Sequence, residues 1–349
     1  MQGMSWDVVP ATSTVGIAGG IFIAAAVVTI VFSMRLVRLG DALADRTGWG
    51  EALFGAVLFG AATSLSGIVM TGVSAGLDEP ELAYSNAVGG IAVQTLAIVL
   101  ADIAYRRVNL EHAAASARNL LFGCLLIVLL ATALFASFSP AVTAFGVHPM
   151  SVVLIGFYWG GLALITKQGR PLWRAVTTID TRADVPEAHG SFGSRGMAGL
   201  WTEFAAVALG VIVAGWAVAR SAEVTINATG LRAGFVGAVL MGLVNALPEM
   251  VTAIAAVRQG ALTLAIAAVI GGNCLDALNL VVGDIAYRGG SLYHAAGPDQ
   301  LLVTTAGLVM TGVVLGGLLL RQRGGWLRVG FDGIVLALVY ATTVAGLVI

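Results

Sequence analysis

The sequence predicts an all-α polytopic membrane protein, with ten transmembrane helices arranged as two five-helix repeats of inverted topology. Three observations predict this fold. Of the 349 residues, 58% are hydrophobic and 11% are charged, whereas about a quarter of the residues in a soluble domain are charged. Ten stretches are long and apolar enough to cross a bilayer. Finally, the two halves of the chain resemble each other at one constant separation.

A helix needs roughly 20 mostly apolar residues to cross the ~30 Å hydrocarbon core of a bilayer. The second and the seventh of the predicted spans can each contain a broken helix. In chain order, the predicted spans are residues 15–38, 51–76, 83–105, 119–138, 148–166, 197–219, 233–257, 262–285, 300–320 and 329–348.

The basic residues predict the orientation of the chain. With the N-terminus outside, all of the 18 Lys and Arg residues except Arg220, Arg232 and Arg288 fall in cytoplasmic loops or at the cytoplasmic ends of spans. The positive-inside rule therefore places both termini outside and requires an even number of spans. The excess of Arg over Lys and the abundant Ala and Gly suggest a GC-rich bacterial genome, so the expected location is a bacterial plasma membrane.

An internal repeat divides the chain. GAVL at 55–58 recurs at 237–240 and DIAYR at 102–106 recurs at 284–288, so equivalent residues lie 182 apart, as 55 does from 237 and 102 from 284. Five spans in each half make the second copy run through the bilayer in the opposite sense, as is typical of secondary transporters. The predicted parts are a first repeat (1–166, with a hairpin at about 51–105), a cytoplasmic linker (167–195) and a second repeat (196–349, with a hairpin at about 233–285). Asp102 and Asp284 precede Tyr-Arg in each copy, which favours a local interfacial ion pair.

Polar residues gather near the presumed midplane of the two hairpins. An intramembrane carboxylate costs roughly 2.5–3.5 kcal/mol on insertion scales, so Glu249 and Asp276 are candidate functional residues. For the amides and hydroxyls, interhelical hydrogen bonds that hold the bundle together are an equal alternative. The second hairpin offers Asn245, Glu249, Thr252, Asn273, Asp276 and Asn279, and the first offers Thr63, Ser64, Thr71, Asn86, Gln94 and Thr95.

Helix-breaking residues accompany these polar side chains. Pro248 lacks an N–H group and leaves a carbonyl one turn earlier without its donor, and unsatisfied carbonyls at membrane depth must line a cavity or meet a ligand. Carboxylate, amide, hydroxyl and carbonyl oxygens suit a hard cation such as Ca²⁺ or Na⁺. The residues expected to weaken the helices are Pro248, Gly67, Gly89, Gly90, Gly271 and Gly272.

The segments ALPEMVTAI and AIAAVIGGNCLDALNL resemble the second α-repeat of the sodium/calcium exchanger family, within the cation/Ca²⁺ exchanger superfamily. ATSLSG at 62–67 and SNAVGGIAVQ at 85–94 are similar to a degenerate first repeat. The resemblance implies that Glu249 is a direct ligand of Ca²⁺ and Na⁺, and that Asp276 is a second charged ligand. The cation-binding set that it implies is Glu249, Asp276, Asn245, Thr63, Ser64, Gln94 and Asn273.

The first repeat departs from the family pattern because Ser66-Gly67 replaces Pro-Glu. Both charges of the site then come from the second copy, which predicts weaker Ca²⁺ binding that restoring Pro-Glu should tighten. A desolvated carboxylate can also carry a proton. Three hypotheses therefore stand: exchange of Ca²⁺ for Na⁺, exchange coupled to H⁺ or involving a monovalent cation, and a membrane scaffold that transports nothing.

Other functions find no support in the sequence. It contains no zinc-protease motif, nucleophile elbow or phosphate-binding glycine loop, so we expect no enzyme. Cys124 and Cys274 lie inside spans and offer no disulfide framework or metal site, so we expect no cofactor. The Arg-rich segment 167–195 is explained by cytoplasmic topology, with no nucleic-acid binding. The expected partners are inorganic cations and the lipid bilayer.

Overall fold

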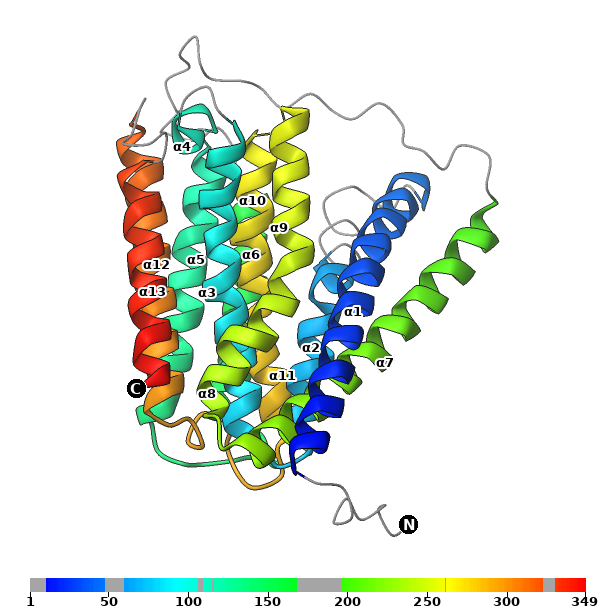
Figure 1. Ribbon diagram of the computed structural model, residues 1–349. Coiled ribbons are helices and arrows are strands. Elements are labelled where there is room, and N and C mark those ends of the chain that lie inside the picture. The colour runs from blue at the N-terminus through cyan, green and yellow to red at the C-terminus, as the bar shows by residue number, and fades with distance from the viewer. Residues whose placement is uncertain are drawn as a thin grey trace.

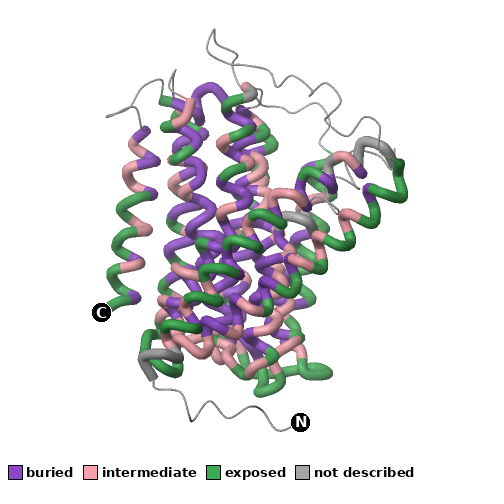
Figure 2. Tube along the Cα trace, turned by 45° about the vertical axis from the view of Figure 1, so that its right-hand side comes forward, coloured by how far each residue is buried: buried purple, intermediate pink, exposed green. Residues whose placement is uncertain are grey.

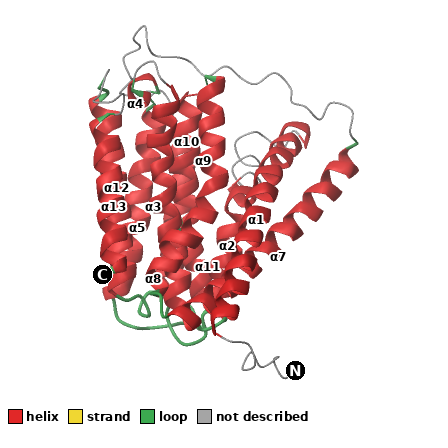
Figure 3. Ribbon diagram, in the orientation of Figure 1, coloured by secondary structure: helices red, strands yellow, loops and turns green. Residues whose placement is uncertain are grey.

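The computed structural model describes residues 11–47, 60–105, 109–114, 116–167, 196–260, 262–322 and 330–349. Within those ranges the chain forms helices and no strands (Figure 3). The elements are α1 (Ala11–Thr47), α2 (Gly60–Gly76), α3 (Pro80–Tyr105), α4 (Leu110–Ala113), α5 (Ala117–Phe138), α6 (Pro149–Thr166), α7 (Met197–Thr229), α8 (Ala233–Phe235), the π-helix η3 (Val236–Met241), α9 (Gly242–Gln259), α10 (Leu262–Asp276), α11 (Asn279–Ala286), α12 (Pro298–Leu320) and α13 (Phe331–Val348).

The helices confirm the polytopic all-α fold that the sequence predicts. Nine of the described helical stretches are long and apolar enough to cross a membrane, and Ser64–Gly76 is a shorter apolar helix. That shorter helix lies in the predicted span 51–76, of which residues 51–59 lie outside the described ranges. α1 begins and α13 ends at the same end of the bundle, as an even number of crossings requires (Figure 1). The predicted linker 167–195 is undescribed beyond Lys167, and the division into parts stays a prediction.

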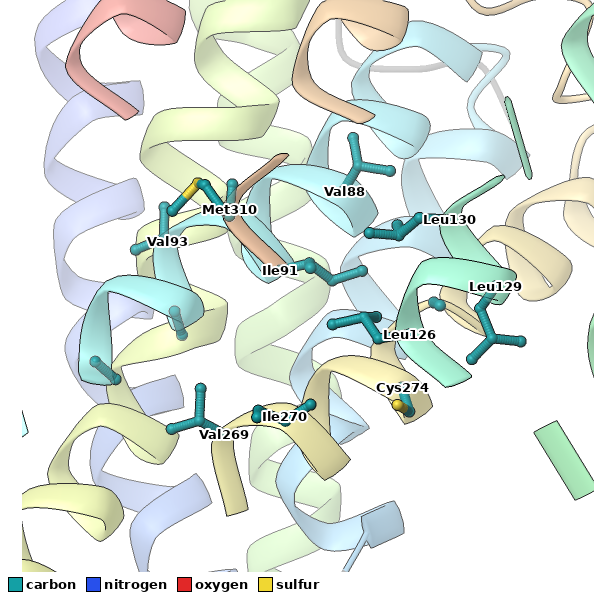
Figure 4. Packing of buried hydrophobic residues seen from close by; sticks show 14 of the residues in the cluster. Val88, Ile91, Val93, Leu126, Leu129, Leu130, Val269, Ile270, Cys274 and Met310 are labelled. Atoms are coloured by element: carbon teal, nitrogen blue, oxygen red, sulfur yellow. The ribbon is translucent and has the colours of Figure 1, made fainter. Parts of the chain in front are cut away.

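The core lies around α3, the most buried of the spanning helices. Buried residues fill the middle of the bundle (Figure 2). Ile91 of α3 packs among Leu126 of α5, Ile270 of α10 and Met310 of α12 in one continuous apolar cluster (Figure 4). Side chains at i, i+3 and i+4 lie on one face of a helix. Different faces of α3 therefore contact different neighbouring helices. This dry surrounding keeps water away from any polar group placed on the inner face of α3.

Helices α1 and α7 form a separate pair at one edge of the bundle (Figure 1). Arg35 of α1 donates from Nε to Glu203 of α7 over 2.8 Å. Much of the remaining surface of both helices is exposed and apolar, as expected for contact with lipid. The ion pair ties the two helices together on their common face.

Asp102 and Asp284 are bonded in the same way in the two repeats. Asp102 accepts from the backbone N–H of Leu110 at 2.7 Å, and Asp284 from that of Leu292 at 3.0 Å. Residues 110 and 292 are themselves equivalent, because the separation of 182 residues relates them as it relates the two aspartates. The repeated DIAYR sequence therefore encodes a repeated turn.

Each aspartate also reaches the other repeat. The second oxygen of Asp102 accepts from the N–H of Gly330 at 3.4 Å, just before α13. The second oxygen of Asp284 accepts at 2.7 Å from the N–H of His148, just before α6, and from Ser151. Helix N-termini carry unsatisfied N–H groups, so each repeat caps a helix of its counterpart. The prediction of a local ion pair is wrong for Asp284, whose partners are backbone N–H groups and a hydroxyl.

The glycines of the hairpins allow close packing. α3 runs unbroken through Gly89 and Gly90, α10 through Gly271 and Gly272, and α2 through Gly67. The predicted interruptions at these five glycines are therefore wrong. A Cβ at Gly89 would overlap the backbone of Ala238 in η3, and one at Gly242 would lie 2.9 Å from the carbonyl carbon of Gly89. Lack of a side chain at these two positions brings α3 and the η3–α9 segment into backbone contact.

We predict that Asp284→Asn destabilises the protein. The variant leaves at least one of three hydrogen-bond donors facing an NH₂ group, and an unsatisfied buried donor costs roughly 1–3 kcal/mol. The midpoint of thermal unfolding in detergent should fall measurably below that of the wild type. Asp78→Asn is the matched control, because Asp78 is exposed and its φ of 65° is one that Asn tolerates. Equal midpoints for both variants would contradict the capping role.

Glu111 of α4 makes the stability of the fold depend on pH. Its side chain is 2% exposed, and burial, followed by the nearby Asp332 and Asp102 carboxylates, raises its pKa well above the ordinary 4.5. The folded protein therefore holds this proton more tightly than the unfolded chain does. The resulting stabilisation is complete below pH 4.5 and is lost as the pH rises through the raised pKa.

We predict that Glu111→Gln makes stability less dependent on pH. Gln resembles the protonated acid, so the variant should lose less of its unfolding midpoint than the wild type as the pH rises above 4.5. The measurement is thermal unfolding in detergent across that range. Glu81→Gln, at an exposed position, should keep the wild-type slope. A Glu111→Gln slope as steep as that of the wild type would refute the assignment.

Candidate functional site

Two hairpins, α2–α3 and α9–α11, bring polar side chains from both repeats into the middle of the bundle. None of these side chains is more than 4% exposed, although they lie among apolar helices. Such burial costs free energy unless each group finds a partner or a ligand. The residues are Ser64, Ser66, Thr71, Asn86, Gln94 and Thr95 from the first repeat, and Asn245, Glu249, Asn273, Asp276 and Asn279 from the second.

Glu249 and Asp276 are the two carboxylates of this region, and Asp276 lies close enough for its charge to act on Glu249. Glu249 is 4% exposed, and neither of its oxygens has a hydrogen-bond partner in the described part of the chain. Asp276 accepts a long hydrogen bond of 3.5 Å from Nδ2 of Asn279 and lies beside the hydroxyl of Ser64. A buried carboxylate in this condition requires a bound proton or a cation.

The helix around Glu249 is irregular but continuous. Pro248 lies inside α9, which carries on to Gln259, so the predicted break at Pro248 is wrong. The π-helical segment η3 directly precedes α9, and such segments are often found at functional sites. Pro248 still has no N–H group to give to the carbonyl one turn earlier. The interruption lies elsewhere, between the end of α10 at Asp276 and the start of α11 at Asn279.

This interruption places Asp276 at a helix end. Asn273 and Asp276 come from the last turn of α10, and Asn279 is the first residue of α11. A spacing of three residues brings side chains to one face, which explains the contact between Asp276 and Asn279. The equivalent helix in the first repeat, α3, has no break. The two hairpins therefore differ in backbone as well as in charge.

Hydrogen bonds across the repeats connect the remaining polar groups. Ser66 donates from Oγ to Oδ1 of Asn245 at 3.3 Å, and Asn273 donates from Nδ2 to Thr95 at 2.9 Å. Asn86 donates to Thr71 at 2.9 Å within the first hairpin. The interhelical role considered for the amides and hydroxyls therefore applies to these pairs.

Several buried atoms remain without a partner after these bonds are made. Among the eleven buried polar residues of this region, the oxygens without a partner in the described chain are Oγ of Ser64, Oδ1 of Asn86, Oε1 of Gln94, Oδ1 of Asn273 and both carboxylate oxygens of Glu249. Free lone pairs in a dry interior are what a transported hard cation would coordinate. Among the described residues, no three His, Cys, Asp or Glu side chains cluster to hold a metal. Two carboxylates with neutral oxygens fit a cation that binds and leaves.

Most of the cation-binding residues that the resemblance implies lie in this buried region. Ser64 and Glu249 both lie near Asp276, whereas Asn245 and Asn273 are bonded to Ser66 and Thr95 of the first repeat. Gln94 lies against α10, with Nε2 3.1 Å from the position of a Cβ at Gly272. The side chain of the other predicted ligand, Thr63, falls outside the described side chains.

The structure adds Ser66, Asn86 and Asn279 to the site. The sequence indicates Asn86 and Asn279 as polar residues of the hairpins without assigning either a role, and Ser66 only as a departure from the family pattern. The spacing from Asp276 to Asn279 is a signal that could have identified Asn279. No comparable signal exists for Ser66, because its partner Asn245 lies 179 residues away in the sequence.

Comparisons with known proteins agree with this fold. The family described as sodium/calcium exchanger protein matches residues 17–167 and 199–348. The structure of native YfkE is similar at a TM-score of 0.64 and 14% identity, covering 94% of this chain and 91% of that one. The H⁺/Ca²⁺ exchanger CAX is similar at a TM-score of 0.63 and 14% identity, covering 97% and 86%.

A third solved structure extends the comparison. The sodium-calcium exchanger NCX_Mj is similar at a TM-score of 0.54 and 18% identity, covering 95% of this chain and 99% of that one. No curated protein matches the chain in sequence. The family match spans both repeats and includes both buried hairpins, so the chain belongs to the sodium/calcium exchanger protein family.

Proposed function

We propose that this protein is a secondary active cation antiporter that exchanges Ca²⁺ for Na⁺ across the membrane by alternating access. The observation that carries the proposal is Glu249, whose two buried oxygens have no partner among the described residues. A scaffold that transports nothing would not need this carboxylate, because a Leu in its place would remove the cost of burying it. The Arg-rich, Ala- and Gly-rich composition favours a bacterial plasma membrane, and the positive-inside rule favours both termini outside.

Charge balance explains how one site could serve both ions. Glu249 and Asp276, when ionised, supply two negative charges, which one Ca²⁺ neutralises. Na⁺ ions can use the same oxygens, so either kind of ion displaces the other. Ser64, Gln94 and Asn273 offer neutral oxygens without hydrogen-bond partners, which helps to replace the hydration shell of the ion. Competition for one set of ligands makes the movement of one ion depend on the other.

Proton coupling is the second candidate. One observation favours it: no hydrogen-bond donor from the described residues holds Glu249 in its charged form, so protonation could replace a cation there. Among the solved structures that share the fold, one is an H⁺/Ca²⁺ exchanger and another a sodium-calcium exchanger. The identity of the coupling ion therefore needs a direct measurement.

We predict Na⁺-dependent Ca²⁺ uptake by the purified protein in proteoliposomes loaded with Na⁺. Uptake should require outward-directed Na⁺ and should persist when no pH gradient is imposed. Liposomes loaded with choline instead of Na⁺ are the control. Uptake that responds only to an imposed pH gradient would replace Na⁺ with H⁺ as the coupling ion.

We predict that Glu249→Gln and Asp276→Asn each abolish Ca²⁺ transport while the protein still folds. Each change removes one of two charges at almost constant volume, so Ca²⁺ would leave water for a site with half the balancing charge. Flux should fall to the level of empty liposomes, with a monodisperse elution profile in detergent. Glu81→Gln makes the same change at an exposed position and should keep wild-type flux at saturating Ca²⁺. Wild-type flux in either site variant would exclude this site.

A further inference from the structure

Gly67 occupies the place in the first repeat that Glu249 occupies in the second. Residues 67 and 249 are 182 apart, the separation that relates the two copies, and residues 63 and 245 correspond in the same way. Symmetry would therefore place a second glutamate at position 67. The structure shows what fills the space that this side chain would need.

The amide of Asn245 fills much of that space. A Cβ on Gly67 would lie 2.6 Å from Oδ1 of Asn245 and 2.9 Å from its Nδ2. A Cβ on Gly90 of α3 would lie 2.6 Å from the same Nδ2. Side-chain atoms at both positions are excluded at these distances unless the amide moves. The Asn245 amide can therefore occupy its position only because two residues, one on each helix of the first hairpin, are glycines.

A second amide closes the same space. Nδ2 of Asn279 would lie 2.7 Å from a Cβ on Gly67, and the same nitrogen donates to Asp276. Asn245 is one helical turn before Glu249 on α9, so both point to one face. The space beside Gly67 is therefore bordered by Asn245, which lies one turn from Glu249, and by Asn279, which is bonded to Asp276. It lies within the buried site.

The Asn245 amide is anchored at one atom and free at the other. Its Oδ1 accepts the hydrogen bond from Ser66, whereas Nδ2 has no partner among the described residues, at 1% exposure of the side chain. A buried NH₂ group without an acceptor is costly. Both ends of the amide border the place where a side chain at position 67 would begin, with Oδ1 nearer to it than Nδ2.

We propose that Asn245 determines ion selectivity by standing in for the missing carboxylate of the first repeat, which keeps the charge of the site at that of Glu249 and Asp276 alone. This inference rests on the proposed cation site. An uncharged amide weakens the preference for a divalent over a monovalent cation, because Coulomb attraction scales with the charge of each partner. Restoring a glutamate at position 67 would not tighten Ca²⁺ binding while the Asn245 amide, with two atoms within 2.9 Å of its Cβ, occupies its space, contrary to the expectation from the family pattern.

The first test inserts a charge without changing volume. Asn245→Asp should tighten Ca²⁺ binding to the purified protein at least tenfold relative to the wild type, measured by equilibrium binding of radioactive Ca²⁺ in detergent. Asn119→Asp is the matched control: Asn119 is also buried, but it donates to the backbone carbonyl of Thr263 and neither residue belongs to the buried site. Its replacement should leave Ca²⁺ affinity unchanged. Equal tightening in both variants, or none in Asn245→Asp, would overturn the proposal.

The second test asks whether the Asn245 side chain blocks a glutamate at position 67. It does not require the Asn245→Asp variant to fold. Gly67→Glu alone should bind Ca²⁺ no more tightly than the wild type, and Gly67→Glu combined with Asn245→Ala should bind it at least tenfold more tightly than Gly67→Glu. Tightening by Gly67→Glu alone, or no gain in the double variant, would show that Asn245 does not block the position. If the wild type binds no Ca²⁺, the proposed function fails instead, so the two failures are distinguishable.

Discussion

A carboxylate buried in a membrane protein needs charge or hydrogen bonds to balance it, and the structure around Glu249 is organised by this requirement. The described chain gives its oxygens no hydrogen bond, and the charge that acts on Glu249 is that of another carboxylate, Asp276. The surrounding helices supply neutral oxygens and a dry interior. A cation or a proton is the partner that this arrangement lacks, and transport follows if that partner can be exchanged between the two sides.

The interior of the bundle is dry because the hairpins approach closely. Gly89 and Gly242 bring α3 and the η3–α9 segment into backbone contact, and the apolar cluster around Ile91 fills the adjoining volume (Figure 4). The asymmetry of the site develops within this frame. The second repeat supplies both charges and a broken helix, whereas the first supplies an unbroken helix, hydroxyls and amides. Two copies of one motif have thus become chemically different halves.

The sequence predicts those properties that depend on local pattern. Hydropathy indicates the spans, the separation of 182 residues indicates the inverted repeat, and the polarity of Glu249 and Asp276 inside apolar stretches marks the site. The roles of the glycines are not predictable in this way, because a glycine that weakens a helix and a glycine that allows close packing look the same in the sequence. Gly67 shows this difference, since its significance lies in the amides of Asn245 and Asn279 that face it. The partners of Asp102 and Asp284 were missed for a similar reason, because Gly330 lies 228 residues from Asp102.

The exchange of caps between the repeats also bears on biosynthesis. His148 donates its N–H group to a carboxylate that leaves the ribosome 136 residues later, so this N–H group at the start of α6 lacks its partner until more than half of the second repeat has been made. A chain ending after the first repeat would leave that donor without its partner. Two such half-length chains could supply it only by assembling with each other in opposite orientations. Fusion of the copies into one chain makes that assembly independent of protein concentration.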